Sequence, residues 1–197
     1  MNGVDFVSKL KDLEMPVVTI SASSKIIQKP SNYTRLFINR LYRRGIVSRI
    51  EGGLYCLPGT GEFTISSRIV PFSYITGYAA LDHYGLTTQI STKIQVIAPK
   101  FHRPVKLRNY TVEFSKVKMG FIYGYIVTSN GPVFAEPEKI FIDDLYLHGR
   151  QYYAEEFEYS MRNGKLNVEK LRKYAKMSNN EALIKRVYAY LDGRRNR

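Results

Sequence analysis

The stretch SNYTRLFINRLYRRGIVSRIEGGLYCLPG, residues 31 to 59, carries the clearest structural signal in the chain. Its first half places apolar side chains at helical spacing: Thr34, Phe37, Ile38 and Leu41. We expect a helix over residues 32 to 44, capped by Ser31 and ended by Gly45. After Gly45, the runs IVSRI and LYCL are rich in β-branched and aromatic residues and flank a Glu-Gly-Gly turn. This pattern predicts a β-hairpin.

The residues before this stretch predict two further helices. In VDFVSKLKDLEM, residues 4 to 15, apolar side chains recur every third residue and predict an amphipathic helix that ends before Pro16: Val4, Val7, Leu10 and Leu13. The run VVTI follows, and ASSKIIQ, residues 22 to 28, is expected to form a short helix that stops before Pro30. Three helices followed by a β-hairpin is the order of a winged helix-turn-helix, to which we assign residues 1–60.

The remaining sequence predicts an α+β domain with a mainly antiparallel sheet over residues 64–150, after a linker in PGTGEF. SYITGYAALDHYG, residues 73 to 85, reads as a helix between Ser73 and Gly85. Strands are expected in KIQVIA, YTVEFSKV, YGYIV and PVFA, with a hairpin turn at residues 129–131. EPEKIFIDDLYL begins a helix near Pro137. Residues 151–197 are expected to form a helical extension packed on this domain, with Asn167 as a helix cap.

Charge and composition narrow the class of partner. The formal net charge is +13, and the excess of Lys and Arg is spread along the chain, which favours a polyanion such as nucleic acid. Cys56 is the only cysteine, so neither an internal disulfide nor a cysteine-based metal site is expected. The N-terminus lacks the apolar run of a signal peptide, and the longest uncharged run is shorter than the ~20 residues of a membrane span. We therefore expect a cytoplasmic protein without a membrane segment.

In helix-turn-helix domains the second helix of the motif enters the major groove of double-stranded DNA, and its first residues meet the base edges. Asparagine can pair with adenine and arginine with guanine through two hydrogen bonds each. The predicted base contacts are Asn32, Tyr33, Arg35 and Asn39. The predicted contacts to the DNA backbone, including the wing, are Ser31, Arg40, Arg43, Arg44, Arg49, Gly52 and Gly53. An ordinary basic helix surface, or a winged helix that binds protein, is the alternative interpretation.

Catalytic chemistry finds little support in the sequence. The three histidines lie far apart: His83, His102 and His148. There is no glycine-rich phosphate-binding loop and no nucleophile elbow. The acidic residues Glu136, Glu138, Asp143 and Asp144 could serve a metal-dependent nuclease, but Glu136 and Glu138 flank a helix-starting proline, and Asp143 is spaced to pair with Lys139. We predict no catalytic residue, metal or cofactor, and keep a nucleic-acid-processing enzyme and a protein-docking module as alternatives.

The segments SYITGYAALDHYGLTTQISTKIQVIAPK and GPVFAEPEKIFIDDLYL resemble the AbiEi family of antitoxins and transcriptional regulators, known from type IV toxin-antitoxin and abortive-infection systems. The resemblance covers most of the chain, including LNVEKLRKYAKM in the helical end. It implies an autorepressor that binds inverted repeats through Asn32, Tyr33, Arg35 and Arg43, and a C-terminal domain that counters a nucleotidyltransferase-like toxin. The long basic end, residues 186 to 197, departs from the family pattern. It leaves open whether the chain has a toxin neighbour or is a stand-alone regulator of archaeal type. The oligomeric state is also open.

Overall fold

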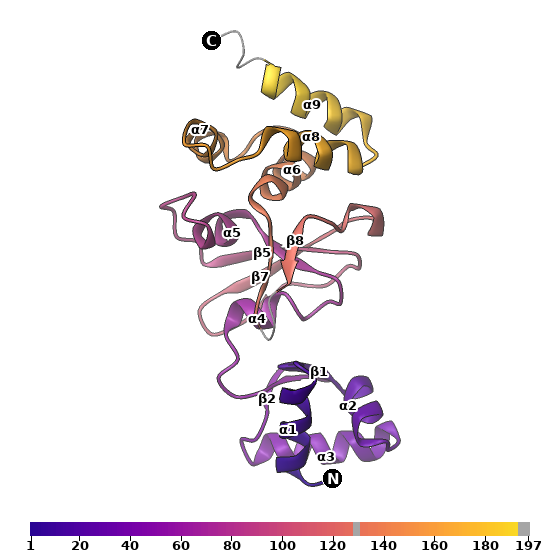
Figure 1. Cartoon of the computed structure of the whole chain (residues 1–197). Helices are drawn as coiled ribbons and strands as arrows, with labels where there is room; N and C mark the ends of the chain where they lie inside the picture. Colours follow the sequence, from indigo (N-terminus) through magenta and orange to yellow (C-terminus); the bar gives the residue numbers. More distant parts are fainter. Residues whose placement is uncertain (128–130, 193–197) are drawn as a thin grey trace.

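The structure is a computed structural model that describes residues 1–127 and 131–192. In these residues the fold is mixed α and β, with nine α-helices and two β-sheets. Figure 1 shows the first sixty residues at one end, a six-stranded sheet in the middle and the C-terminal helices at the other end. Within the described ranges, no helix combines the length and apolar character needed to cross a membrane.

The first sixty residues, here called the first region, contain three helices and a three-stranded sheet. The elements are α1 (Gly3–Asp12), β1 (Val17–Thr19), α2 (Ile20–Ile27), α3 (Ser31–Arg43), β2 (Ser48–Glu51) and β3 (Leu54–Cys56). The strand order is β1-β3-β2, and both pairings are antiparallel. The predicted helices and hairpin are therefore present. Of the expected apolar stripe Leu10 is buried, next to Phe6, whereas Val4 and Leu13 are exposed.

The start of α3 differs from the expectation in one detail. Ser31 is the first helical residue and not its cap, because Pro30 occupies the N-cap position and offers no side-chain acceptor. Instead, the Thr34 hydroxyl donates to the Pro30 carbonyl at 3.0 Å, and the Asn32 side-chain oxygen accepts from the Tyr33 N–H at 2.8 Å. The helix ends before Gly45, which has a φ of +70° that favours glycine.

The strands β1 and β3 of the small sheet bury side chains on both faces and join the two parts of the chain. Val18 and Tyr55 face the helices of the first region and share a core with Phe6, Ile38 and other residues of α1 and α3. On the opposite face, Val17, Leu54 and Cys56 belong to the larger core that extends into the rest of the chain. The first region is thus docked on its neighbour through an apolar contact.

The six-stranded sheet has the strand order β6-β7-β5-β4-β9-β8. Its strands are β4 (Tyr74–Thr76), β5 (Lys93–Ala98), β6 (Val105–Lys106), β7 (Thr111–Lys116), β8 (Tyr125–Val127) and β9 (Val133–Ala135). Three pairings are antiparallel, including the expected hairpin of β8 and β9, whose turn residues 128–130 lie outside the described residues. The pairings β4 with β9 and β5 with β7 are parallel. The sheet is therefore mixed, because β6 carries the chain back along the edge before β7 pairs with β5.

Short helices precede and follow β4. They are α4 (Glu62–Ser66) and α5 (Gly77–His83), and a 3-10 helix, η1, covers Met119–Phe121. Ser73 does not cap a helix as expected: β4 follows it, and its hydroxyl donates to the carbonyls of Ser67 and Val70 at 3.1 and 2.7 Å. α5 starts only after β4, at Gly77, and Gly85 lies directly beyond its end, as predicted.

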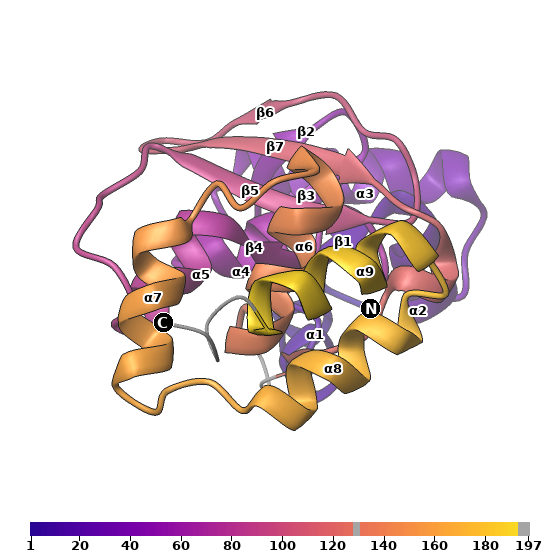
Figure 2. The ribbon, with the colours of Figure 1, turned by 90° about the horizontal axis from the view of Figure 1, so that it is seen from above.

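In the view from above, the C-terminal helices lie nearest the viewer, in front of the six-stranded sheet (Figure 2). They are α6 (Pro137–His148), α7 (Ala154–Arg162), α8 (Val168–Met177) and α9 (Glu181–Asp192). Two sequence predictions are confirmed here. Pro137 is the first residue of α6, and Asn167 caps α8 by accepting the Lys170 N–H at 3.0 Å. Both α8 and α9 contact α6 and each other, so the three helices pack together as one group.

Candidate nucleic-acid interface

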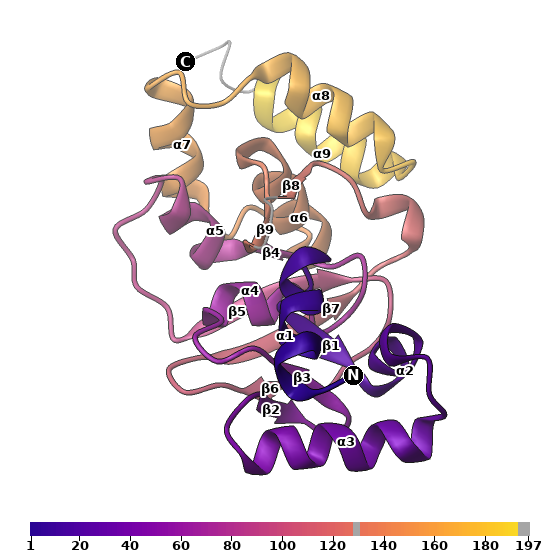
Figure 3. The ribbon, with the colours of Figure 1, turned by 60° about the horizontal axis from the view of Figure 1, so that its bottom comes forward.

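One face of α3 presents polar and basic side chains to solvent. The exposed residues recur at intervals of three and four, which places them on one stripe of the helix: Asn32, Arg35, Leu36, Asn39, Arg40 and Arg43. Figure 3 shows α3 along the outer edge of the first region, away from the six-stranded sheet. The stripe therefore faces outward from the molecule, and we call it the α3 stripe.

The opposite face of α3 fixes this orientation. Thr34, Ile38 and Leu41 are buried. Phe37, next to them, meets the ring of Phe6 edge-on with centroids 5.6 Å apart. A rotation of α3 about its axis would expose these apolar side chains to water, at roughly 25 cal/mol for each Å² of apolar surface. The packing against α1 thus holds the α3 stripe toward solvent.

The α3 stripe is strongly basic. α3 has no acidic residue in its first turn, and its sequence contains none further along. Within the described part of the chain, Arg35, Arg40, Arg43 and Arg44 have no ion-pair partner. Since guanidinium groups in the open retain their charge and their hydrogen-bond donors, this face attracts anions with planar or phosphate geometry.

Most of the predicted contact residues of α3 come together on this face. Asn32, Arg35, Asn39 and others lie on the stripe itself. By helical spacing, Tyr33 and Arg44 lie on the flank next to Arg40, and Ser31 lies on the other flank. Sequence reasoning missed Leu36, which is 61% exposed near the centre of the stripe. Its position, four residues after Asn32 and three before Asn39, was the available signal.

The turn between β2 and β3 holds the other predicted residues. Arg49 is exposed, and its Nε donates to the Glu51 carbonyl at 3.3 Å. A bulge lies between Arg49 and Glu51. Gly52 is exposed, and Gly53 has a φ of +84°, a conformation that favours glycine. The carbonyl of Gly53 accepts the N–H of Ile20 at 3.1 Å, so the turn is attached to the start of α2.

The same turn is attached to the rest of the chain. The Glu51 carboxylate lies 2.9 Å from Nε2 of His102, in the loop between β5 and β6, and 3.9 Å from the guanidinium of Arg103. Further along the chain, both the backbone and the side-chain nitrogen of Asn109 donate to the carboxylate of Glu62, at the start of α4, at 2.9 Å. The position of the hairpin turn is therefore set by contacts from outside the first region.

The acidic residues of EPEK are engaged in holding α8 on α6. Glu136 accepts the Tyr174 hydroxyl and the Lys170 ammonium, the latter at 2.9 Å. Glu138 accepts the Asn167 N–H at 2.9 Å, and Lys170 lies 3.3 Å from its second oxygen. Partial burial alone would raise the pKa of Glu136, but the hydrogen bonds from Tyr174 and Lys170 outweigh it and lower that pKa.

Asp143 and Lys139 form a buried ion pair on α6, as their spacing predicted. Both are almost fully buried, and Asp143 also accepts the hydroxyls of Thr76 at 3.0 Å and Tyr74 at 3.2 Å. Burial lowers the pKa of Lys139 and raises the pKa of Asp143, while each charge partly offsets the effect on the other. The Lys139 ammonium lies 3.7 Å from the ring centre of Phe121. This pair is closed off from solvent by aromatic rings.

Asp144 and the histidines also have structural partners. Asp144 accepts the N–H groups of Tyr152 and Tyr153 at 2.7 and 3.1 Å, and it lies 2.8 Å from Nδ1 of His148. His83 stacks on Phe134 with ring centres 4.2 Å apart. The histidines do not gather at one place. Among the residues that the structure describes, no group of three His, Cys, Asp or Glu side chains could hold a metal ion.

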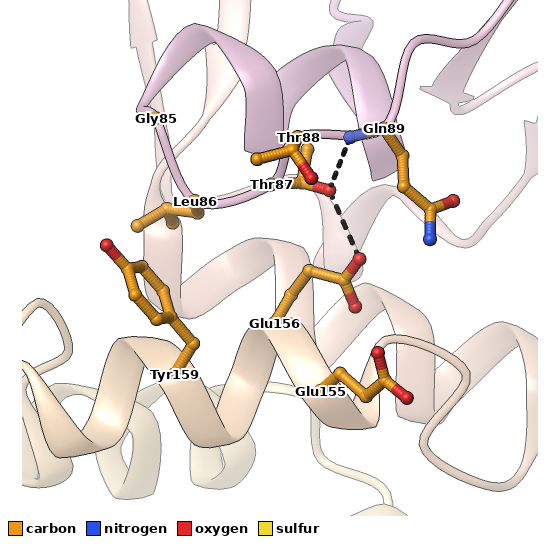
Figure 4. A pocket seen from close by; sticks show the side chains of 8 residues that line it. All are labelled: Gly85, Leu86, Thr87, Thr88, Gln89, Glu155, Glu156 and Tyr159. Atoms are coloured by element: carbon orange, nitrogen blue, oxygen red, sulfur yellow. Dashed lines mark hydrogen bonds between the residues drawn. The ribbon is translucent and has the colours of Figure 1, made fainter.

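A cavity of about 310 Å³ lies between α7 and the segment that follows α5 (Figure 4). Its lining includes Glu155 and Glu156 from α7 and Thr87 from the segment. Thr87 donates its hydroxyl to Glu156 at 3.1 Å and accepts the Gln89 N–H at 3.1 Å. The lining residues include no histidine, cysteine, lysine or arginine. Two neighbouring carboxylates, one of them already hydrogen-bonded, do not by themselves form a catalytic arrangement.

Comparisons with known proteins do not assign the chain to a family. No protein-family model matches it, and no curated protein is similar to it at a significant level. The resemblance to the AbiEi family therefore stays a prediction that rests on the sequence segments quoted above.

Proposed function

We propose that the chain is a sequence-specific DNA-binding repressor in which residues 1–60 act as a winged helix-turn-helix domain. The observation that carries the proposal is the α3 stripe, whose arginines face solvent without an acidic partner in the described residues. The order of α1, β1, α2, α3 and the β2–β3 hairpin supports it. So does the short connection of three residues between α2 and α3, which is typical of the helix-turn-helix motif.

The α3 stripe has the side chains that major-groove recognition needs. Asn32 and Asn39 can each bind adenine, and Arg35 can bind the acceptor atoms of guanine. Leu36 adds an apolar surface that suits the methyl group of thymine. Tyr33 joins the base contacts from the flank, and the remaining contacts are to phosphate: Ser31, Arg40, Arg43, Arg44, Arg49 and the backbone at Gly52 and Gly53.

The finer part of the proposal follows the sequence resemblance. We infer that the chain is an AbiEi-type antitoxin that represses its own operon at inverted repeats, and that the region after residue 64 counters a nucleotidyltransferase-like toxin. The EPEK element, which is the most specific part of the resemblance, fastens α8 to α6 through Glu136 and Glu138. Its contribution to this activity is therefore to the shape of the C-terminal domain.

The test is a binding titration of the full chain with double-stranded DNA. A duplex enriched from a randomised library is compared with a scrambled duplex of equal length by fluorescence anisotropy at several salt concentrations. We expect binding to the selected duplex to be at least ~1000-fold tighter at physiological salt. Failure of the library to yield any preferred sequence would refute the proposed repressor. Equal, salt-sensitive binding to both duplexes would instead favour a nucleic-acid-processing enzyme, for which a nuclease assay follows.

Two variants separate the proposed roles on α3. Arg35→Ala should weaken binding to the selected duplex by ~1 to 3 kcal/mol and relax the preference at one base pair. Arg43→Ala should weaken all duplexes alike and reduce the salt dependence by about one counterion. Lys185→Ala, an exposed change on α9 at the other end of the molecule, is the matched control and should alter neither quantity. Equal losses on selected and scrambled DNA for Arg35→Ala would contradict its role in base recognition.

A further inference from the structure

A second cavity, of about 300 Å³, lies where the first region meets the six-stranded sheet. Met15 and Val17 line it from the first region, and Val70, Tyr125 and Val133 line it from the other side. The walls combine apolar side chains with the polar residues Ser67, Arg68 and Ser73. Ligand sites are commonly found at such boundaries between regions, as pockets with apolar walls and a few polar groups.

Arg68 supplies the cation of this cavity. One of its terminal nitrogens donates to the Gly131 carbonyl at 3.1 Å, while its Nε is buried and has no hydrogen-bond partner among the residues that the structure describes. No carboxylate of the described residues pairs with it. A guanidinium that lacks a carboxylate partner favours an anion that accepts two parallel hydrogen bonds, here from its terminal nitrogens. A carboxylate has this geometry.

Phe72 stands at the rim of the cavity in a strained conformation. Its φ is +60°, which is a marked departure for a bulky residue, and its side chain is 68% exposed although it lines the cavity. An aromatic ring exposed to water contributes little to the stability of the fold, and the backbone strain at Phe72 lowers that stability. Such strained residues are concentrated at functional sites, where surrounding structure holds them in place. The ring of Phe72 is placed to cover an apolar ligand in the cavity.

We propose that this cavity binds a small carboxylate with an apolar body. The carboxylate pairs with the guanidinium of Arg68, the hydrocarbon part packs on Met15 and Val70, and Phe72 covers it at the rim. If each non-hydrogen atom takes the ~30 Å³ that a water molecule occupies, the cavity holds about ten of them. Octanoate and benzoate are of this size. The proposal goes beyond DNA binding and does not depend on it, so the two can fail separately.

The test is isothermal titration of the full chain with octanoate, benzoate and octan-1-ol. We expect saturable octanoate binding with a dissociation constant of about 1 mM or lower. Octan-1-ol has the same chain but no charge and should bind at least ~10-fold more weakly. Arg68→Met should remove this difference between acid and alcohol. Arg108→Met, which changes an exposed arginine outside the cavity, is the matched control and should preserve it.

Two further measurements keep the result independent of any folding defect in Arg68→Met. Phe72→Gly relieves the backbone strain and removes the ring, so it should weaken octanoate and octan-1-ol alike. In the unchanged protein carrying isotope-labelled methionine methyl groups, octanoate should shift the Met15 resonance and leave that of Met177, on α8, unchanged. Absence of saturable octanoate and benzoate binding would overturn the proposal. So would binding that shifts Met177 and not Met15, or equal octanoate affinity in Arg68→Met and the wild type.

Discussion

Replacing Lys139 by methionine tests the most deeply buried charge in the molecule. Lys139 is 0% exposed, and its ammonium lies 3.7, 4.7 and 5.3 Å from the ring centres of Phe121, Tyr123 and Tyr74. Methionine keeps much of the side-chain volume. The substitution removes the positive charge and leaves Asp143, 1% exposed, with the hydrogen bonds from Thr76 and Tyr74 as its only ones among the described residues.

The expected cost follows from the uncompensated charge. Removing one partner of a buried ion pair costs about 3 to 5 kcal/mol, and for a chain of this size each kcal/mol lowers the midpoint of thermal unfolding by about 2 to 4 °C. We therefore expect the midpoint of Lys139→Met to fall by about 6 to 20 °C. Such a loss is a large part of the ~5 to 15 kcal/mol that stabilises a typical domain.

The loss should depend on pH in a direction that the pair dictates. Burial raises the pKa of Asp143, and loss of Lys139 removes the charge that opposes this rise. A carboxyl whose pKa is higher in the folded than in the unfolded protein favours folding at low pH, and its contribution is lost as the pH rises. Lys139→Met should therefore be less destabilised at pH 4 to 5 than at pH 8, relative to wild type.

The assay is thermal unfolding followed by circular dichroism at both pH values. Lys93→Met is the matched control, because Lys93 pairs with Glu113 at 2.8 Å but its side chain is 63% exposed. This control should leave the midpoint nearly unchanged. If Lys139→Met were as stable as Lys93→Met at pH 8, the inference that a buried, uncompensated Asp143 carboxylate is costly would be refuted.

Three further substitutions test contacts outside the first region. Glu136→Gln should lower the unfolding midpoint at pH 7, because the pKa of Glu136 is lowered in the folded protein. The difference from wild type should shrink as the pH falls below the ordinary glutamate pKa of 4.5. A difference that stays constant down to pH 3 would contradict the ion pair with Lys170. Gly77→Ala should destabilise the protein more than Gly85→Ala. Both residues have positive φ, but only at Gly77 would the added carbon overlap a neighbour, the Gln95 amide at 1.8 Å. Equal unfolding midpoints for the two variants would show that the overlap is relieved without cost.

The sequence was sufficient where a few neighbouring residues decide the structure. The spacing of apolar residues predicted α3 and its buried face, and Asn167 and Pro137 marked the starts of α8 and α6. These features depend on helical period and on hydrogen bonds within one turn. The two wrong predictions of a helix cap, Ser31 and Ser73, also concern local structure. Ser31 is the first residue of α3 itself, and Ser73 directly precedes β4.

The tertiary structure decided what depends on residues far apart in the chain. The spacing of Lys139 and Asp143 predicted their pairing, but their complete burial follows from the sheet and aromatic residues that close around α6. The parallel pairing of β5 with β7 could not be read from strand patterns, because alternation within a strand is independent of the direction of its neighbour. The cavity beside Arg68 is lined by Met15 and Val17 of the first region together with residues of β8 and β9, which are far apart in the chain. Periodicity and capping are encoded within a few residues, whereas strand direction, burial and cavities depend on long-range packing.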